Sequence, residues 1–190
     1  MKTFLKLVDK ITGHSVKFYN KRFYSYNNIY LVYTDETDLN LPAIDIIDYN
    51  NLLLFDTLFD VDITVDKDYI VLQKDFMTVK LAYAEINLNE LNDYIDKLND
   101  NLVYELNNTL ILEKLKDVYD LNSSVEIMLS GNKIICETIN SKIEFTLDKE
   151  VDREYYNIQE IFDSVNPDIL RFYDNRIEAI KEDTHFVVFC

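Results

Sequence analysis

Glycine, proline, cysteine and histidine are scarce in this sequence, with two residues of each among 190. So few glycines argue against the glycine-rich loops that bind phosphates, and favour turns built from Asn, Asp and Lys. The two histidines, His14 and His185, cannot build a typical histidine-based metal site. Cys136 and Cys190 are too few for a disulfide framework and lack metal-ligand spacing, so we expect both to be reduced thiols.

Long apolar runs and catalytic motifs are also missing. No run approaches the roughly 20 apolar residues that cross a membrane, and the N-terminal segment lacks the apolar stretch of a signal peptide. These features predict a soluble protein of the cytoplasm with no membrane partner. The motifs G-x-S-x-G, G-x-x-x-x-G-K and C-x-x-C are absent, and carboxylates are so abundant that any acid–base pair would be an arbitrary choice. The sequence therefore predicts a protein that is not an enzyme and that binds no cofactor or metal.

Acidic residues dominate the charged residues, with 35 Asp and Glu against 19 Lys and Arg and a formal net charge of −16. Such a charge repels nucleic acid on average, so a role on DNA requires positive charge that is gathered locally. Hydrophobic residues make up 48% of the chain and include 14 Tyr and 11 Phe, which is enough for a substantial core. The length suits one large domain or two small ones.

A helix followed by strands recurs along the chain. In residues 44–84, a short strand precedes a helix at 50–59, and three strands with polar turns follow. Near the C-terminus the same plan returns, and the letters FDTL at 55–58 are matched by FDSV at 162–165. Two aligned copies far apart indicate an internal repeat.

The first unit begins with a predicted helix over residues 2–12. Its apolar residues fall at i, i+3, i+4 and i+7, which is the pattern of one buried helix face. Its lysines fall at i, i+4 and i+8 on the opposite face, and three strands follow within residues 15–33. The apolar residues are Phe4, Leu7, Val8 and Ile11, and the lysines are Lys2, Lys6 and Lys10.

The second half repeats this plan after a connector at 85–101, which we predict to be partly helical. A strand at 102–106 precedes a helix at 110–120 and three strands within 124–147, with a hairpin turn at Ser130-Gly131-Asn132. A helix at 158–165 and three further strands complete a fourth unit. The predicted fold class is α+β: two domains, 1–88 and 102–190, each with two units of a helix plus antiparallel strands, joined by a connector at 89–101.

The residues in these units resemble the DNA polymerase sliding clamps, most closely the processivity clamps of the bacteriophage T4 type in the PCNA-like family. The resemblance is carried by residues 43–85, 112–134 and 162–170. It implies the DNA clamp fold and a ring in which twelve helices face a central hole. Four units per chain would then require three subunits (12/4 = 3), which is a head-to-tail homotrimer. The implied function is a phage-type processivity factor that encircles duplex DNA without sequence preference, tethers a polymerase, and is opened by a clamp loader.

The resemblance also assigns candidate site residues. The helices that face the hole would present Lys2, Lys6, Lys10, Lys114 and Lys116 to DNA. The helices of units two and four depart from this pattern, since they contain no Lys or Arg and offer Asp56, Glu160 and Asp163. A solvated helix face is the simpler explanation of any lysine row.

Clamps also bind short peptides of their partners in an apolar outer pocket. The matching positions here are Ile86, Leu88, Leu91, Phe186, Val188 and Phe189, although core packing explains each of them equally well. Two other functions stay open. One is an acidic monomeric binding protein that mimics DNA or acts as an inhibitor. The other is a clamp-fold scaffold for transcription or repair factors.

Overall fold

A computed structural model describes residues 1–12, 15–47, 49–54, 61–122, 125–156 and 159–190 of the chain. The chain divides into two compact units. The first contains Met1–Asn99 and Glu182–Phe186, and the second contains Asp100–Lys181 and Val187–Cys190. The predicted domain boundaries at residues 88 and 102 stay a prediction.

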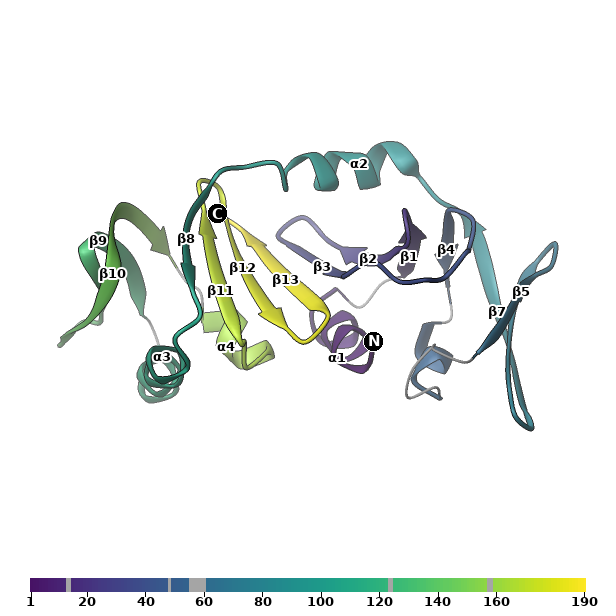
Figure 1. The fold of residues 1–190 in the computed structure, drawn as a ribbon, viewed down its shortest axis with the longest axis horizontal. Helices are drawn as coiled ribbons and strands as arrows, with labels where there is room; N and C mark the ends of the chain where they lie inside the picture. The colour runs from purple at the N-terminus through teal and green to yellow at the C-terminus, as the bar shows by residue number, and fades with distance from the viewer. Residues whose placement is uncertain (13–14, 48, 55–60, 123–124, 157–158) are drawn as a thin grey trace. The chain divides into compact units, whose positions relative to one another are not determined.

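The first unit is built on antiparallel strands in the order β5–β6–β7–β4–β1–β2–β3 (Figure 1). Its strands are β1 (Val16–Tyr19), β2 (Arg22–Tyr26), β3 (Tyr30–Thr34), β4 (Ile44–Ile46), β5 (Asp62–Val65), β6 (Tyr69–Lys74) and β7 (Met77–Glu85). Its helices are α1 (Lys2–Leu7), the π-helix η1 (Val8–Thr12), the 3-10 helix η2 (Tyr49–Leu54) and α2 (Leu88–Asp96).

The helix predicted over residues 2–12 is confirmed as α1 followed directly by η1. Phe4 and Val8 are 0% exposed and Leu7 is 2% exposed, so the predicted apolar stripe is the buried face, although Ile11 is only half-buried. The Phe4 ring lies 6.2 Å from the ring of Phe23 on β2. This aromatic contact joins the helix to one face of the sheet.

The other face of the same strands is covered by α2, which confirms the partly helical connector. Successive strand residues point to opposite faces, so Tyr26 lies on the face opposite Phe23. Tyr94 of α2 packs on Tyr26 with ring centres 4.3 Å apart, and Leu91 is fully buried. The side chain of Asn87 caps the helix by accepting a hydrogen bond from the Glu90 amide at 3.4 Å. Figure 1 shows α1 and α2 on opposite sides of β1–β3.

The first unit also includes a segment from the end of the chain, Glu182–Phe186. The Asp35 amide donates to the Asp183 carbonyl at 2.8 Å, and Thr3 donates to the Glu182 carboxylate at 2.9 Å. Asp35 also lies 3.0 Å from the Nε2 atom of His185, and the His185 ring stacks on Tyr33. This segment is thus held by both the sheet and α1.

In the second unit, β8 lies at the edge of a row in the order β12–β11–β8, and β9 and β10 form a separate two-stranded sheet. The two helices α3 and α4 contact each other, and their rings Tyr119 and Phe162 stack at 5.1 Å. The strands are β8 (Leu102–Leu106), β9 (Glu126–Glu137), β10 (Lys142–Tyr156), β11 (Ile169–Tyr173) and β12 (Arg176–Lys181), and the helices are α3 (Thr109–Leu121) and α4 (Gln159–Ser164). The last strand, β13 (Thr184–Phe189), belongs to the first unit up to Phe186 and to the second unit after it.

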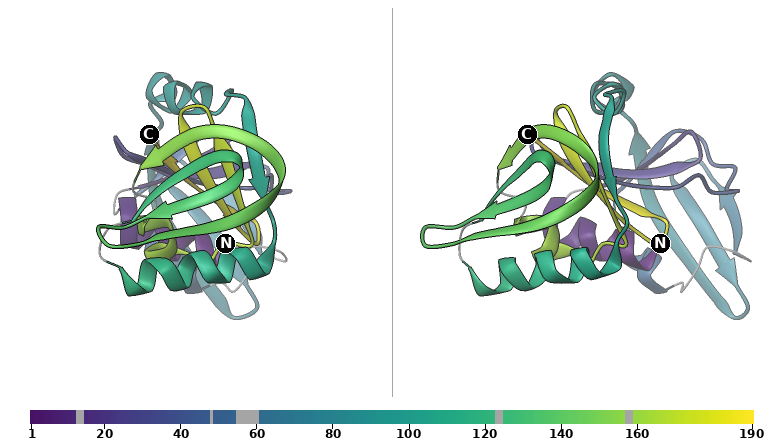
Figure 2. Two further views of the ribbon diagram at one scale, coloured as in Figure 1. Left: turned by 90° about the vertical axis from the view of Figure 1, so that its left-hand side faces the viewer. Right: turned by 60° about the vertical axis from the view of Figure 1, so that its left-hand side comes forward.

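The hairpin turn predicted at Ser130-Gly131-Asn132 is wrong. These residues lie inside the continuous strand β9, and the three strands predicted within 124–147 are instead two long antiparallel strands (Figure 2). Gly131 pairs with Val151, and the register with β10 shifts between Thr146 and Val151. The positive φ of +57° at Gly131 therefore serves an irregularity of the ladder, which glycine accommodates without steric cost.

The helix predicted over residues 50–59 is only partly described. The described portion is the 3-10 helix η2, and residues 55–59 lie outside the described residues, as do Asp56 and His14. The helix predicted at 110–120 is confirmed as α3, and the strand predicted at 102–106 is confirmed as β8.

Candidate nucleic-acid interface

The lysines of α1 and η1 form the lysine row, defined here as Lys2, Lys6 and Lys10. All three are exposed, on the side opposite the buried stripe. Asp9 is the one acidic residue between residues 2 and 12. Three positive charges thus stand against one negative charge on this helix, in a chain that is strongly acidic as a whole.

The π-helical turn helps to keep the lysine row on one face. In an α-helix each step of four residues turns about 40° past a full turn, so a long row drifts around the axis. A π-helix bonds residue i to residue i+5, and its turn is correspondingly wider. Lys10 lies in η1, so the step from Lys6 to Lys10 stays closer to one full turn. The threonine that ends η1, Thr12, donates its hydroxyl to the Val8 carbonyl at 3.1 Å.

The lysines of α3 lie in a different environment. Lys114 donates to the Asp117 carboxylate at 2.7 Å, and this hydrogen bond raises the pKa of Lys114 above its ordinary value. Lys116 is half-buried. Three acidic residues accompany these two lysines on the helix, namely Glu113, Asp117 and Asp120. The α3 helix therefore offers no net positive charge to a phosphate backbone.

The remaining helices add no positive charge among the described residues. In α4, Glu160 and Asp163 are exposed, and η2 contains no charged residue. Among the described residues, the helices of units two and four thus lack Lys and Arg, as the sequence indicates. The lysine row is the strongest basic feature on the described helices.

The predicted partner-pocket residues differ in accessibility. Leu91 and Phe186 are 0% and 1% exposed, and Phe186 packs against Tyr30 with ring centres 5.7 Å apart. Val188 is also buried, whereas Leu88 is 37% exposed. Ile86 and Phe189 are half-buried. Leu88, Ile86 and Phe189 are therefore at least partly accessible, whereas the other three residues lie in the core.

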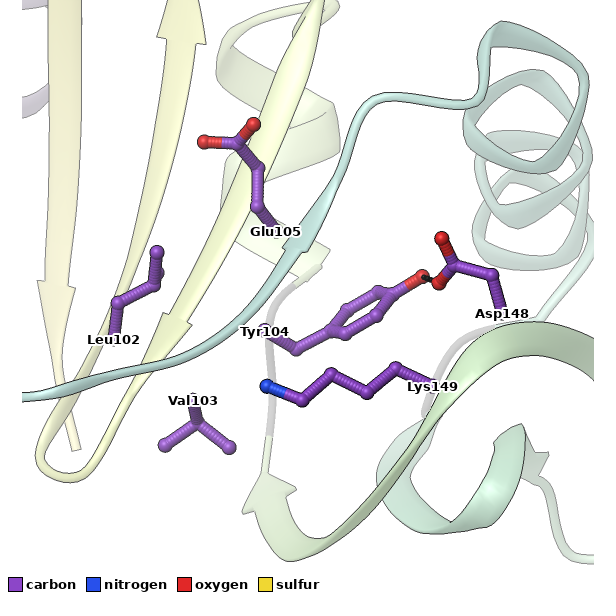
Figure 3. A pocket seen from close by; sticks show the side chains of 6 residues that line it. All are labelled: Leu102, Val103, Tyr104, Glu105, Asp148 and Lys149. Atoms are coloured by element: carbon purple, nitrogen blue, oxygen red, sulfur yellow. Dashed lines mark hydrogen bonds between the residues drawn. The ribbon is translucent and has the colours of Figure 1, made fainter.

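The structure also contains a pocket that sequence reasoning missed. Its volume is about 220 Å³, and it lies between the edge strand β8 and the irregular part of β10 (Figure 3). The hydroxyl of Tyr104 donates to Oδ1 of Asp148 at 2.8 Å. Burial, together with this carboxylate, raises the pKa of Tyr104 to about 12, so the phenol stays neutral at physiological pH. The lining residues are Leu102, Val103, Tyr104, Glu105, Asp148 and Lys149.

Two further results concern the described residues as a set. No group of three or more His, Cys, Asp or Glu side chains among them is arranged to hold a metal ion. None of the helices they form has the length and apolar character needed to cross a bilayer.

Solved structures of DNA polymerase sliding clamps share this arrangement of helices and strands. A protein of Eubacterium rectale described as a DNA polymerase III beta subunit superposes with a TM-score of 0.72 and 12% identity, over 99% of this chain and 62% of its own. The sliding clamp of Bacillus subtilis superposes with a TM-score of 0.67 and 10% identity, over 99% and 60%. The chain has the sliding-clamp fold. A sliding clamp of Pseudomonas aeruginosa, solved with griselimycin bound, gives a TM-score of 0.67 at 8% identity, over 100% and 62%.

This likeness is one of fold, because the identities are low. The chain spans about 60% of the length of these clamps. No protein-family model matches the sequence, and no curated protein sequence matches it.

Proposed function

We propose that this protein is a non-catalytic sliding clamp that encircles duplex DNA and tethers a polymerase to it. The observation that supports this best is the clamp fold, which extends over 99% of the chain. The lysine row adds a local positive face on a chain with a net charge of −16. Such a distribution suits a ring whose hole attracts phosphates while its outer surface repels them.

The assembly that we propose is a homotrimer of about 68 kDa (3 × 22.5 kDa). A threefold ring would place three lysine rows around the duplex. Contacts from exposed lysines to phosphates are sequence-independent and weakened by salt, which permits sliding. A polymerase and a clamp loader would be its protein partners, with a cytoplasmic location in a bacterial cell infected by a phage.

The test is topological. The protein is incubated at high concentration with linear duplex DNA that is fixed to a bead at one end, and the free end is then blocked with streptavidin. An encircling ring should stay on the blocked DNA through a salt wash and should leave when a restriction enzyme cuts the duplex. Equal retention on blocked and open DNA would instead indicate a groove binder and would contradict encirclement.

The net charge favours a second candidate, an acidic monomer that mimics DNA and occupies the cleft of a nucleic-acid-binding protein. Light scattering after size exclusion separates the two candidates. A mass of about 68 kDa agrees with the ring, and a concentration-independent mass of 22.5 kDa agrees with the mimic. A clamp-fold scaffold for transcription or repair factors would trimerise and encircle DNA as well, but it would not extend the products of a polymerase.

A further inference from the structure

The two most exposed large apolar side chains among the described residues both lie at hairpin tips. Phe76 is 102% exposed on the turn between β6 and β7, and Ile139 is 93% exposed on the link between β9 and β10. In Figure 1 the hairpin that leads into β7 projects freely from the rest of its sheet. Turns usually hold Gly, Pro, Asn, Asp or Ser, so the turn itself does not explain a bulky apolar residue. Aromatic side chains that folding leaves in water are typical of protein interfaces.

The turn between β6 and β7 fixes the position of Phe76. Lys74 pairs with Met77 across the hairpin, so that Asp75 and Phe76 alone form the loop. Asp75 has a φ of +52°, as the first residue of a two-residue hairpin loop commonly does. The Lys74 side chain is half-buried and has no ion pair with any described residue. The Phe76 tip, defined as Lys74, Asp75 and Phe76, thus combines an exposed ring with an unpaired ammonium group.

A pocket of about 240 Å³ lies beside the other exposed side chain. The residues that line this Ile139 pocket are Glu126, Glu137, Thr138 and Ile139. Glu137 lies 3.7 Å from the Nζ atom of Lys142, whereas Glu126 has no ion pair with any described residue. A cavity of about 150 Å³ is enough to take up benzene, so the pocket has room for a phenylalanine ring. The Phe76 of the same chain does not occupy it, because that side chain is fully exposed.

The Phe76 tip suits a protein surface better than duplex DNA. The Asp75 carboxylate offsets the charge of Lys74, so the tip offers a phosphate backbone no net positive charge. The paired and stacked bases of a duplex also present no free face to an aromatic ring. The Ile139 pocket offers both complements, namely an apolar side chain for the ring and an unpaired carboxylate, that of Glu126, for the ammonium group.

We propose that the Phe76 tip of one copy docks in the Ile139 pocket of a second copy, with Phe76 against Ile139 and Lys74 paired with Glu126. This contact rests on the proposed ring and names the surfaces that join its subunits. The tip belongs to the first unit and the pocket to the second. A contact between two different surfaces is heterologous, so it repeats from copy to copy until the ring closes.

The substitution Phe76→Ala tests the contact in the full chain. The ring is exposed, so circular dichroism and thermal unfolding should be unchanged. The loss of an anchor residue should weaken each contact by about thirtyfold or more, so light scattering should show monomers at concentrations where the wild type forms trimers. Leu110→Ala is the matched control, because it truncates an apolar side chain that is 65% exposed on α3 and should keep the wild-type mass.

An exchange of charges tests the ion pair. Lys74→Glu and Glu126→Lys should each weaken assembly, and the double variant should regain most of it, because the pair is restored with reversed polarity. A wild type that is monomeric at every concentration contradicts the ring and this contact together. A wild-type trimer that survives Phe76→Ala, or a double variant weaker than both single variants, overturns the contact alone. A Phe76→Ala trimer that is held less well on end-blocked DNA also overturns it, and assigns the tip to DNA.

Discussion

The helices α1 and α3 both display lysines on an exposed surface, yet they offer different surfaces to a polyanion. The lysine row of α1 and η1 has a single acidic neighbour on its helix, Asp9. On α3, Lys114 is held by Asp117, and three acidic residues outnumber the two lysines. The contrast shows that a lysine on a helix predicts little by itself. Asp9 stands at i+3 from Lys6, so the contrast lies in the balance of charge on each helix and not in lysines that lack partners.

The two helices also differ in what holds them in place. The α3 helix has 13 residues and an Asn108 cap whose side chain accepts from the Ile111 amide. The α1 helix has 6 residues before its π turn, and its first turn has no side-chain cap. Short helices gain little from local interactions, so α1 depends on its buried face.

The largest effect that we expect comes from removing that buried face. Phe4→Ala deletes a ring that is 0% exposed and should lower the free energy of unfolding by about 3–5 kcal/mol. Urea unfolding monitored by circular dichroism measures the change. Leu110→Ala on α3 is the control, because Leu110 is 65% exposed and should change stability by no more than about 0.5 kcal/mol. Similar losses in the two variants would contradict the dependence of α1 on packing.

The second largest effect that we expect is a loss of DNA retention when the lysine row is replaced. Replacing Lys2, Lys6 and Lys10 together with Glu should weaken retention on end-blocked duplex by roughly tenfold or more at moderate salt, because favourable contacts with phosphates become repulsive. Folding and assembly should be nearly unchanged, since exposed charges contribute little to stability. Primer extension with the cognate polymerase should yield shorter products in parallel.

The matched control changes the charge on the other helix. Lys114→Glu with Lys116→Glu should have a clearly smaller effect on retention, because Lys114 is already paired with Asp117. If the α3 double variant lost as much retention as the α1 triple variant, the contrast between the helices would have no functional meaning.

A smaller effect is expected at the start of α3. Asn108→Ala removes the side chain that caps the Ile111 amide at 3.2 Å and should cost about 1 kcal/mol of stability. Thermal unfolding gives the measurement. Asn108→Asp keeps an acceptor at the cap and should retain most of the stability, so equal losses in the two variants would contradict a capping role.

The smallest effect that we expect comes from removing the carboxylate that pairs with Lys114. Asp117→Ala releases Lys114 and should raise DNA retention by about two- to threefold at low salt, with a stability change below about 0.5 kcal/mol. Titration at two salt concentrations measures it, since the gain should shrink as salt rises. A gain that does not depend on salt would argue against an electrostatic origin.

The elements that sequence reasoning located correctly are those with strong local patterns. The strand β8 has the bounds that the sequence predicts, 102–106, because the asparagines that cap the next helix follow it directly. The hairpin turn predicted at Gly131 was wrong because Ser-Gly-Asn is typical of a tight turn. A glycine with a positive φ is equally compatible with an irregularity inside a strand. The pairing that decides between these two readings is made with Val151 and leaves no local signal.

The candidate site was predictable to a similar extent. The exposed lysine row follows from periodicity within one helix. The pairing of Lys114 with Asp117 could have been predicted from their i, i+3 spacing. The Tyr104–Asp148 pocket could not, because its two polar partners are 44 residues apart and meet only through the fold.

The segment Glu182–Phe186 has a consequence for how the protein is made in the cell. Residues 1–99 leave the ribosome before residues 100–181, but the segment that completes their unit follows only after them. The partners of Asp35 and Thr3 are therefore missing until residues 182 and 183 have emerged. Domains usually fold in order of synthesis, and here we expect the first unit to wait for this later segment. Ribosome-bound chains that stop at residue 181 should accordingly be cut by protease within α1, and released full-length chains should be protected.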